Sequence, residues 1–224
     1  MMSDFRMKTC VLGQVSTNCY LIYNEKTKEA VIVDPADNAA YILNKCRELG
    51  ITPMAVLLTH GHFDHILATD DIRRAFHCKV YAGMDEDAML LDPSLNLSGT
   101  FGGDQIGLSA DHLLRDGEVL ELIGFQWKVI FTPGHTAGSV CYLVESEGVL
   151  LSGDTLFADS LGRTDLPTAN SAAIIRSILD KLFVLPEDTM VYPGHGDPTT
   201  IGHEKQYNPV AVYRRRNQQH TGEE

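Results

Sequence analysis

The sequence predicts a single layered α/β domain over residues 1–224, and three observations carry that prediction. Short aliphatic runs of strand length alternate with segments whose apolar residues recur at helical spacing. The length allows one substantial core, and 44% hydrophobic and 21% charged residues are ordinary values for a soluble globular protein. Several aliphatic runs end in tight turns that carry histidine or aspartate, so the strands of the sheets are also expected to present one site.

The first half of the chain is expected to alternate strands and helices. Asp34-Pro35 ends the third strand, because proline cannot donate a hydrogen bond to a sheet ladder. Asn38 can cap the first helix, and Gly50 can end it. The expected strands are residues 7–13, 19–23, 30–33, 54–58 and 79–82, and the expected helices are residues 38–49, 66–76 and 85–91.

The second half begins with a polar, glycine-rich segment and continues mainly as strands. Residues 92–112 are expected to form a long surface loop, of the kind that serves as a lid or a substrate wall. Two strands around Gly124-Phe125 read as a hairpin, and Asn170-Ser171 can cap a later helix. The expected strands are residues 119–123, 127–131, 140–144, 149–151 and 190–192, and the expected helices are residues 172–182 and 203–207.

Residues 59–65, called the heptad below, are the segment around which the predicted site is organised. Their sequence is Thr59-His60-Gly61-His62-Phe63-Asp64-His65, directly after the aliphatic strand at residues 54–58. Burying three histidines and an aspartate without partners would cost several kcal/mol. Gly61 lets the backbone bend so that the imidazoles can converge. The pattern therefore indicates a metal site at the end of a buried strand.

Three later turns carry side chains of the same kind. His135 and His195 each follow a Pro-Gly pair at the end of a strand, and Asp154 follows Ser152-Gly153 at the end of another. If the strands lie side by side, their ends meet at one edge of the sheets. Asp34, at the end of the third strand, either supports this site or forms a plain turn.

The candidate ligands are too many for one tetrahedral ion and suit two ions. They are His60, His62, Asp64, His65, His135, Asp154 and His195. We expect His60, His62 and His135 to hold one ion, and Asp64, His65 and His195 the other. Asp154 would lie between them, because a carboxylate can bridge two cations and a neutral imidazole cannot. Imidazole and carboxylate ligands without thiolate favour zinc, with iron or manganese as alternatives.

A pair of cations of this kind is expected to support hydrolysis. Two ions about 3.5–4 Å apart lower the pKa of a bridging water to about 7, so that hydroxide is available as the nucleophile. A thioester suits this chemistry better than an amide, because a thiol leaving group has a pKa of about 8.5 and needs little acid assistance. Among the ligands, Asp64 is the candidate for moving a proton.

Composition excludes several other classes of protein. The 30 acidic and 18 basic residues give a net charge of −12, which disfavours binding to nucleic acid. The basic run Arg214-Arg215-Arg216 is interpreted as a solvated helix end. The 5 cysteines are widely spaced without a Cys-x-x-Cys pair, which argues against disulfides and cysteine metal sites. No apolar run approaches the length of a membrane span, so we expect a cytoplasmic protein without membrane partners; the oligomeric state stays open.

The heptad, with His135, Asp154 and His195, resembles the metallo-β-lactamase fold hydrolases over most of the chain. That resemblance implies a four-layer αββα sandwich with two metals at one edge. The segments at residues 153–157, 162–167, 193–196, 199–202 and 207–209 are similar to the glyoxalase II branch. The implied activity is hydrolysis of small hydroxyacylglutathione thioesters. The short chain resembles the type that has no separate C-terminal helical domain, which in longer relatives helps to bind glutathione.

The resemblance leaves other functions open. Arg163, Thr164 and Asp165 either shape a substrate channel or form a structural turn. A mononuclear iron persulfide dioxygenase shares His60, His135 and Asp154 and is the leading alternative. A β-lactamase is disfavoured, since the zinc enzymes typically have cysteine at the position of Asp154. A metal-binding module without activity is the remaining alternative.

Overall fold

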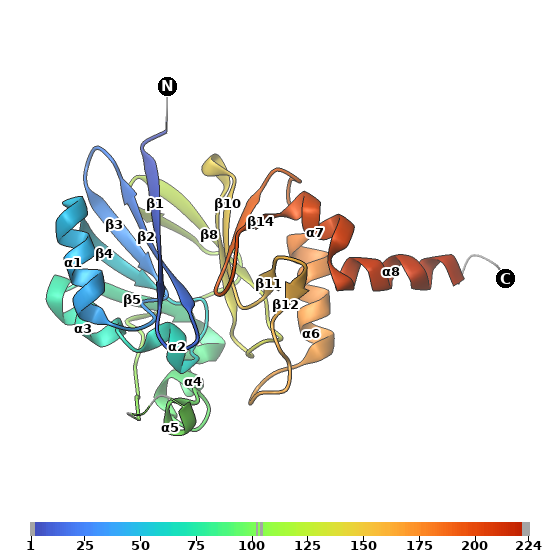
Figure 1. Cartoon of the computed structure of the whole chain (residues 1–224), viewed down its shortest axis with the longest axis horizontal. Coiled ribbons are helices and arrows are strands. Elements are labelled where there is room, and N and C mark those ends of the chain that lie inside the picture. The colour runs from blue at the N-terminus through green and yellow to red at the C-terminus, as the bar shows by residue number, and fades with distance from the viewer. Residues whose placement is uncertain (1–2, 102, 104, 221–224) are drawn as a thin grey trace.

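Two six-stranded sheets pack face to face in the computed structural model, which describes residues 3–101, 103 and 105–220 (Figure 1). Helices α1 (Ala39–Leu49) and α3 (Thr69–Phe76) cover the outer face of one sheet. Helices α6 (Ser171–Arg176) and α7 (Ile201–Tyr207) cover the outer face of the other. The αββα sandwich expected from the family resemblance is therefore confirmed.

The first sheet places β4 between two parallel neighbours, β3 and β5. Its strands in spatial order are β1 (Phe5–Leu12), β2 (Thr17–Asn24), β3 (Glu29–Val33), β4 (Thr52–Leu57), β5 (Lys79–Gly83) and β6 (His112–Leu114). Parallel strands need crossovers, and α1 supplies the one from β3 to β4. As predicted, Asn38 caps α1 by accepting a hydrogen bond from Tyr41 N at 3.2 Å, and Gly50 ends it at φ 67°.

The second sheet is antiparallel except where β10 pairs with β13. Its spatial order is β14 (Thr199–Thr200), β13 (Met190–Pro193), β10 (Val149–Gly153), β9 (Val140–Val144), β8 (Phe125–Phe131) and β7 (Val119–Leu122). Strands β7 and β8 form the predicted hairpin. Its two turn residues, Ile123 and Gly124, both have positive φ, at 51° and 83°, which matches the twist of paired strands.

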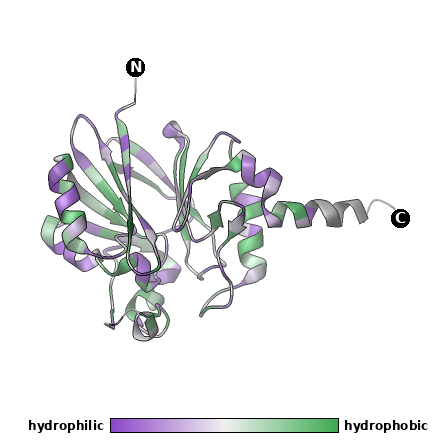
Figure 2. Cartoon of the chain, in the orientation of Figure 1, coloured by the Kyte–Doolittle hydropathy of each residue, from purple (hydrophilic) through white to green (hydrophobic). Residues whose placement is uncertain are grey.

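Three hydrophobic clusters lie between the four layers, one at each contact between adjacent layers. One lies between the first sheet and α1 and α3, a second between the two sheets, and a third between the second sheet and α6. The middle cluster contains Trp127 and Tyr142, both fully buried. Figure 2 shows the corresponding pattern, with hydrophobic residues along the strands and hydrophilic residues on the outer helices α3 and α7.

The helix predicted at residues 66–76 is interrupted in the structure. Helix α2 (Phe63–Ile66) begins inside the heptad, and α3 begins only at Thr69. The break occurs at Ala68, whose N–H donates to Pro35 O at 3.0 Å instead of to the helical carbonyl four residues before it. The predicted single helix is therefore wrong, and the tie to Pro35 anchors the residues that follow the heptad.

Residues 92–112 are only partly the surface loop that we expected. The segment contains helix α5 (Ser98–Phe101), and Asn96, Ser98 and Leu108 are each at most 1% exposed. It follows 3₁₀ turn η1 (Met84–Glu86) and helix α4 (Asp87–Leu91), which together account for the predicted helix 85–91. Residues 102 and 104 lie outside the described part of the chain.

Several elements, most of them short, carry no clear signal in the sequence. They are the hairpin β11 (Leu156–Phe157) and β12 (Ser160–Leu161), turn η2 (Glu145–Glu147), strands β6 and β14, and helix α8 (Pro209–His220). The predicted helix 172–182 is present as α6 and a π-helical continuation, η3 (Ser177–Leu182). Its predicted cap is confirmed, because Asn170 Oδ1 accepts from Ala173 N at 2.9 Å.

The expectations about cysteines and membrane segments can be compared with the structure. All five cysteines are free and buried, as expected for small hydrophobic residues. No helix in the described ranges is long and apolar enough to cross a bilayer. Arg214 is exposed on α8, whereas the side chains of Arg215 and Arg216 fall outside the described part.

Candidate metal centre

The seven predicted ligands come together where strands of both sheets end. Residues 59–65 follow β4, and the turns after β8, β10 and β13 supply the other three side chains. Three groups of these predicted ligands have ligand atoms that all lie within 4.8 Å of one another. These groups are His60 with His62 and His135, Asp64 with His65 and His195, and His60 with His65 and Asp154. The first two are the sets that the sequence assigned to separate cations.

The first set is a cluster of buried, neutral imidazoles. His62 Nδ1 lies 2.9 Å from His135 Nε2. His135 Nδ1 donates to the backbone oxygen of Arg163 at 2.9 Å, so in the neutral ring Nε2 carries a lone pair that points at the cluster. Burial lowers the pKa of His62 to about 3 and that of His60 well below its usual value. Neutral imidazole is the form that binds a metal.

The second set combines one carboxylate with a fully buried and a partly exposed imidazole. Asp64 Oδ2 lies 3.2 Å from His195 Nε2 and 3.4 Å from His65 Nε2. Asp64 also accepts a hydrogen bond from Thr17 Oγ1 at 2.7 Å. The side chain of His195 is 29% exposed, against 0% for His65. Solvent therefore reaches the centre from the His195 side.

Asp154 faces both sets at once. Its Oδ1 lies 3.5 Å from His65 Nε2, and its Oδ2 lies 3.5 Å from both His135 Nε2 and His195 Nε2. No other carboxylate in the described part of the chain is paired with histidines of both sets. This is the position that the sequence prediction assigned to a bridging ligand.

Asp34 orients His65 directly and His60 through Thr59. Its Oδ1 accepts from Thr59 N at 2.8 Å, and its Oδ2 accepts from Thr59 Oγ1 at 2.6 Å and His65 Nδ1 at 2.9 Å. The Thr59 hydroxyl has one proton, which it donates to Asp34, so it accepts from His60 Nδ1 at 3.1 Å. Both rings consequently direct the Nε2 lone pair toward the centre. Of the two sequence hypotheses for Asp34, the supporting role is the one that the geometry favours.

The donor set fits divalent cations. Within the described residues, His60 Nε2, His65 Nε2 and Asp154 Oδ1 are among the buried atoms without a hydrogen-bond partner. Buried polar atoms left in that condition cost about 1–3 kcal/mol each, so a cation that binds them removes a large penalty. Burial opposes a charge on His65, but Asp64, Asp154 and Asp34 outweigh it and raise its pKa to about 10. That shift shows how strongly the surrounding carboxylates favour positive charge.

Close backbone approach is what allows the turns to meet. A Cβ added at Gly194 would lie 2.7 Å from His65 Cε1 and closer still to Asp154 Oδ1. The Gly194 turn is held by Asn18, whose N–H donates to Gly194 O at 2.7 Å and whose Nδ2 donates to Pro193 O at 3.0 Å. The position next to His195 is therefore open only to glycine.

We expect Gly194→Ala to weaken metal binding by at least about tenfold, because the new methyl group displaces Asp154 or His65. Titration of the metal-free protein against a chelator of known affinity measures this. Gly196→Ala is the control, since its Cβ would meet nothing within 4 Å and only its backbone, at φ +77°, is strained. Wild-type affinity in Gly194→Ala would contradict the packing described here.

Glu86 is a buried contributor that the sequence prediction missed. It is 1% exposed, and its carboxylate accepts from Gly61 N at 2.9 Å, from Gly138 N at 2.8 Å and from the Thr136 hydroxyl. It thus joins the heptad to the turn that carries His135. Burial raises the pKa of Glu86. Nothing in the sequence marks it, because it lies in a segment that reads as an ordinary short helix.

The three predicted substrate residues lie beside the centre without contacting the ligands through their side chains. Arg163 pairs with Asp165 in two hydrogen bonds, at 2.7 and 2.8 Å. Thr164 Oγ1 lies 2.6 Å from Ser171 Oγ. Only the backbone oxygen of Arg163 contacts a ligand, His135.

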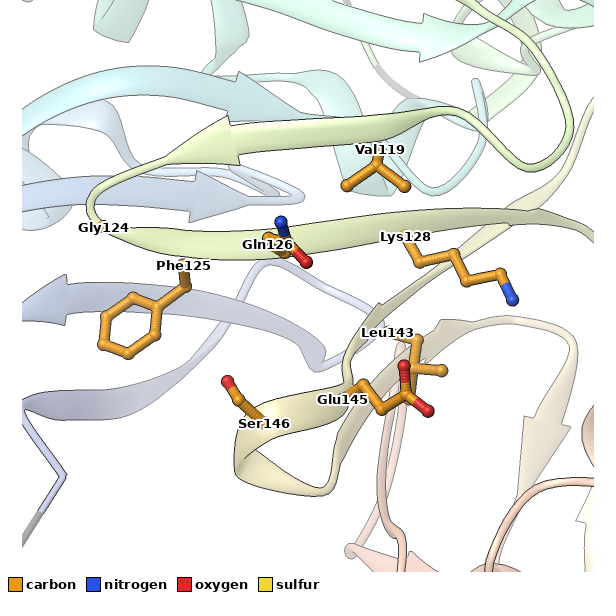
Figure 3. Close-up of a pocket in the computed structure, with 8 residues that line it drawn as sticks. All are labelled: Val119, Gly124, Phe125, Gln126, Lys128, Leu143, Glu145 and Ser146. Carbon is orange, nitrogen blue, oxygen red and sulfur yellow. The ribbon is translucent and has the colours of Figure 1, made fainter.

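Two cavities differ in their relation to the centre. One of about 240 Å³ is bordered by Asp64 and Phe63 from the heptad. Another of about 450 Å³ lies on the outer face of the β7–β8–β9 region and is lined by no candidate ligand (Figure 3). Of these two cavities, the smaller one is therefore the one that borders the metal centre.

Comparison with known proteins places this fold and site in a family. Residues 12–195 match the family described as the metallo-beta-lactamase superfamily. The chain belongs to this superfamily. The probable metallo-hydrolase YqgX of Bacillus subtilis is 39% identical over 199 residues, covering 88% of this chain and 93% of that protein. The hydroxyacylglutathione hydrolase GloC of Haemophilus influenzae is 34% identical over 194 residues, covering 86% and 91%.

Two solved structures of superfamily members are similar throughout. The structure described as BLEG-1 B3 metallo-beta-lactamase is 44% identical, with a TM-score of 0.88, covering 92% of this chain and 100% of that one. The structure of TTHA1623 in a di-iron-bound form is 33% identical, with a TM-score of 0.80, covering 90% and 98%. With its histidine and aspartate clusters, this superfamily member is a metal-dependent hydrolase with a site of the binuclear type.

Proposed function

We propose that this protein is a dinuclear thioesterase that hydrolyses small hydroxyacylglutathione thioesters. The observation that carries the proposal is Asp154, which faces histidines of both ligand sets at 3.5 Å. The similarity to hydroxyacylglutathione hydrolase GloC supports the choice of substrate class. Further parts of the proposal are zinc as the resident metal, a cytoplasmic location, and no nucleic-acid or membrane partner.

The candidate ligands divide into one set for each cation and one ligand that the two cations share. His60, His62 and His135 would hold one cation, and Asp64, His65 and His195 the other, with Asp154 contacting both. When bound, two such cations would lower the pKa of water and polarise a carbonyl group. The partly exposed side, at His195 and Asp64, is where a thioester carbonyl can approach.

Proton transfer places few demands on the protein in this reaction. A thiol has a pKa of about 8.5, so the departing thiolate needs little acid assistance. Burial opposes ionisation of Asp64, but His65 and hydrogen bonds with His195 and Thr17 keep its pKa well below the usual value. Asp64 is therefore suited to remain an ionised ligand, and this favours a ligand role over the proton-transfer role considered from the sequence.

The glutathione half is proposed to lie toward Arg163, Thr164 and Asp165. These residues follow β12 and are next to His135 through the backbone oxygen of Arg163. The Arg163 side chain is exposed and could exchange Asp165 for a substrate carboxylate, because an exposed ion pair of this kind contributes only about 0–1 kcal/mol.

The proposal predicts that lactoylglutathione is turned over by the metal-loaded protein and that a chelator abolishes the turnover. Release of glutathione thiol, followed with a thiol reagent, measures the rate. Metal-loaded protein that releases thiol no faster than the chelated control would refute this substrate.

β-Lactam hydrolysis is a second candidate, because the protein is 44% identical to the structure described as a B3 metallo-beta-lactamase. One residue argues against this candidate: Asp154 occupies the position at which zinc β-lactamases typically have cysteine. Hydrolysis of a chromogenic cephalosporin with a kcat/KM above that for lactoylglutathione would favour this candidate over the thioesterase.

An iron persulfide dioxygenase is a third candidate, because the similarity to a di-iron-bound structure supports iron as an alternative metal. His135 Nε2 and Asp154 Oδ2, 3.5 Å apart, could hold a single iron together with His60. Oxygen uptake with glutathione persulfide, by protein containing one iron per chain, would favour it.

A further inference from the structure

We propose that Thr17 and Asn18 position the ligands of the second cation and do not support those of the first. The second cation is the one assigned to Asp64, His65 and His195. This inference rests on the two-cation centre of the proposed function and does not depend on the substrate. Both residues lie at the start of β2 in the first sheet, whereas His195 follows β13 in the second sheet. The start of β2 therefore connects the two sheets beside the centre.

Thr17 fixes the carboxylate of the second set. It is fully buried, and its hydroxyl donates to Asp64 Oδ2 at 2.7 Å. The same oxygen lies 3.2 Å from His195 Nε2 and 3.4 Å from His65 Nε2. Because the hydroxyl has a single proton to donate, this bond sets the direction in which the carboxylate faces the two imidazoles. A carboxylate without this donor would be free to rotate away from them.

Asn18 fixes the turn that carries His195. Its Nδ2 donates to Pro193 O at 3.0 Å and to Gly196 O at 2.9 Å, and its backbone N–H donates to Gly194 O at 2.7 Å. These carbonyl groups lie on both sides of His195 in the sequence. The side chain of His195 is 29% exposed, so packing restricts it less than it restricts the buried ligands. The hydrogen bonds of Asn18 supply the missing restriction.

The first set has a separate support. Glu86 accepts from Gly61 N in the heptad at 2.9 Å and from Gly138 N, in the turn after β8, at 2.8 Å. Within the described part of the chain, the side chains of Thr17 and Asn18 form no hydrogen bond with these residues or with a ligand of the first set. A change at the start of β2 should consequently alter the second set and spare the first.

Thr17→Val tests this inference, because valine has nearly the shape of threonine but lacks the hydroxyl. Metal-free protein is titrated in zinc buffers of known free concentration, and elemental analysis gives the zinc bound per chain. We expect the dissociation constant of the second cation to rise at least about tenfold, while that of the first keeps its wild-type value. Thr17→Ser is the matched control, since it keeps the hydroxyl and should bind both cations as the wild type does.

Anomalous scattering identifies which cation is lost. Crystals of Thr17→Val, equilibrated at the zinc concentration that just saturates the wild type, should keep the peak of the first set and lose that of the second. Asn18→Ala should give the same pattern, because the turn loses two side-chain hydrogen bonds. Circular dichroism of the metal-free variants is expected to match the wild type, which separates misplaced ligands from unfolding.

Retention of both ions by Thr17→Val and Asn18→Ala at that zinc concentration would overturn this inference and leave the two-cation centre intact. Equal weakening of the two cations would do the same. A single ion in the wild type at saturating zinc would overturn the proposed two-cation centre, and this inference with it. Because no thioester enters the test, failure of the proposed substrate remains a separate result.

Discussion

Asp154→Asn is expected to lower kcat/KM about a thousandfold and to reduce metal content from two ions per chain toward one. Asparagine keeps the volume of the side chain but removes the negative charge between His65, His135 and His195, each 3.5 Å from a carboxylate oxygen. A neutral amide is also a poor bridge between two cations. Both losses follow from one missing charge at the point where the two ligand sets meet.

Elemental analysis, thioester turnover and thermal unfolding of the Asp154→Asn variant measure these effects. Asp71→Asn is the matched control, because Asp71 forms an exposed ion pair with Arg74 on α3, away from the centre. Exposed pairs contribute about 0–1 kcal/mol, so the control should behave as wild type. If Asp154→Asn kept two ions and near-normal turnover, Asp154 would not be the shared ligand.

Asp34→Asn is expected to weaken metal binding about 10- to 100-fold with a smaller effect on folding. Asparagine can occupy the left-handed backbone found here, at φ 49°, so the backbone is not strained. The new NH₂ group, however, must face one of the donors that Asp34 now accepts, from Thr59 or from His65 Nδ1. One or both histidines would lose the orientation that directs Nε2 to the centre.

Chelator competition measures the affinity of Asp34→Asn, and circular dichroism reports whether the fold is kept. The loss of affinity should be accompanied by a change in the absorption spectrum of the cobalt-substituted protein, since the ligand orientation changes. Unchanged affinity and an unchanged cobalt spectrum would show that Asp34 serves only the strand-end turn.

The ligands were predictable because their signals are local. Four of them lie within residues 60–65, and the others follow glycines at strand ends, where the chain must turn. The helix caps at Asn38, Gly50 and Asn170 were predictable for the same reason, since each depends on the residue's own side chain or backbone freedom. Parallel strands ending at one edge then made the convergence of distant turns an expected result.

The features that were not predictable depend on contacts between distant residues. The break at Ala68 arises from a hydrogen bond to Pro35, 33 positions earlier, which no helical spacing reveals. The residues next to Glu86 in the sequence are typical of a surface helix. Its hydrogen-bond partners, Gly61 and Gly138, are distant in the sequence. The segment 92–112 was expected at the surface because it is polar. In the structure, the polar side chains of Asn96 and Ser98 are buried and form hydrogen bonds.

Anomalous X-ray scattering from crystals of the zinc-loaded protein tests the central claim most directly. The geometry predicts two zinc peaks per chain. One should lie among His60, His62 and His135, and the other among Asp64, His65 and His195, with Asp154 contacting both. A single peak, or a second peak away from these side chains, would contradict the two-metal centre.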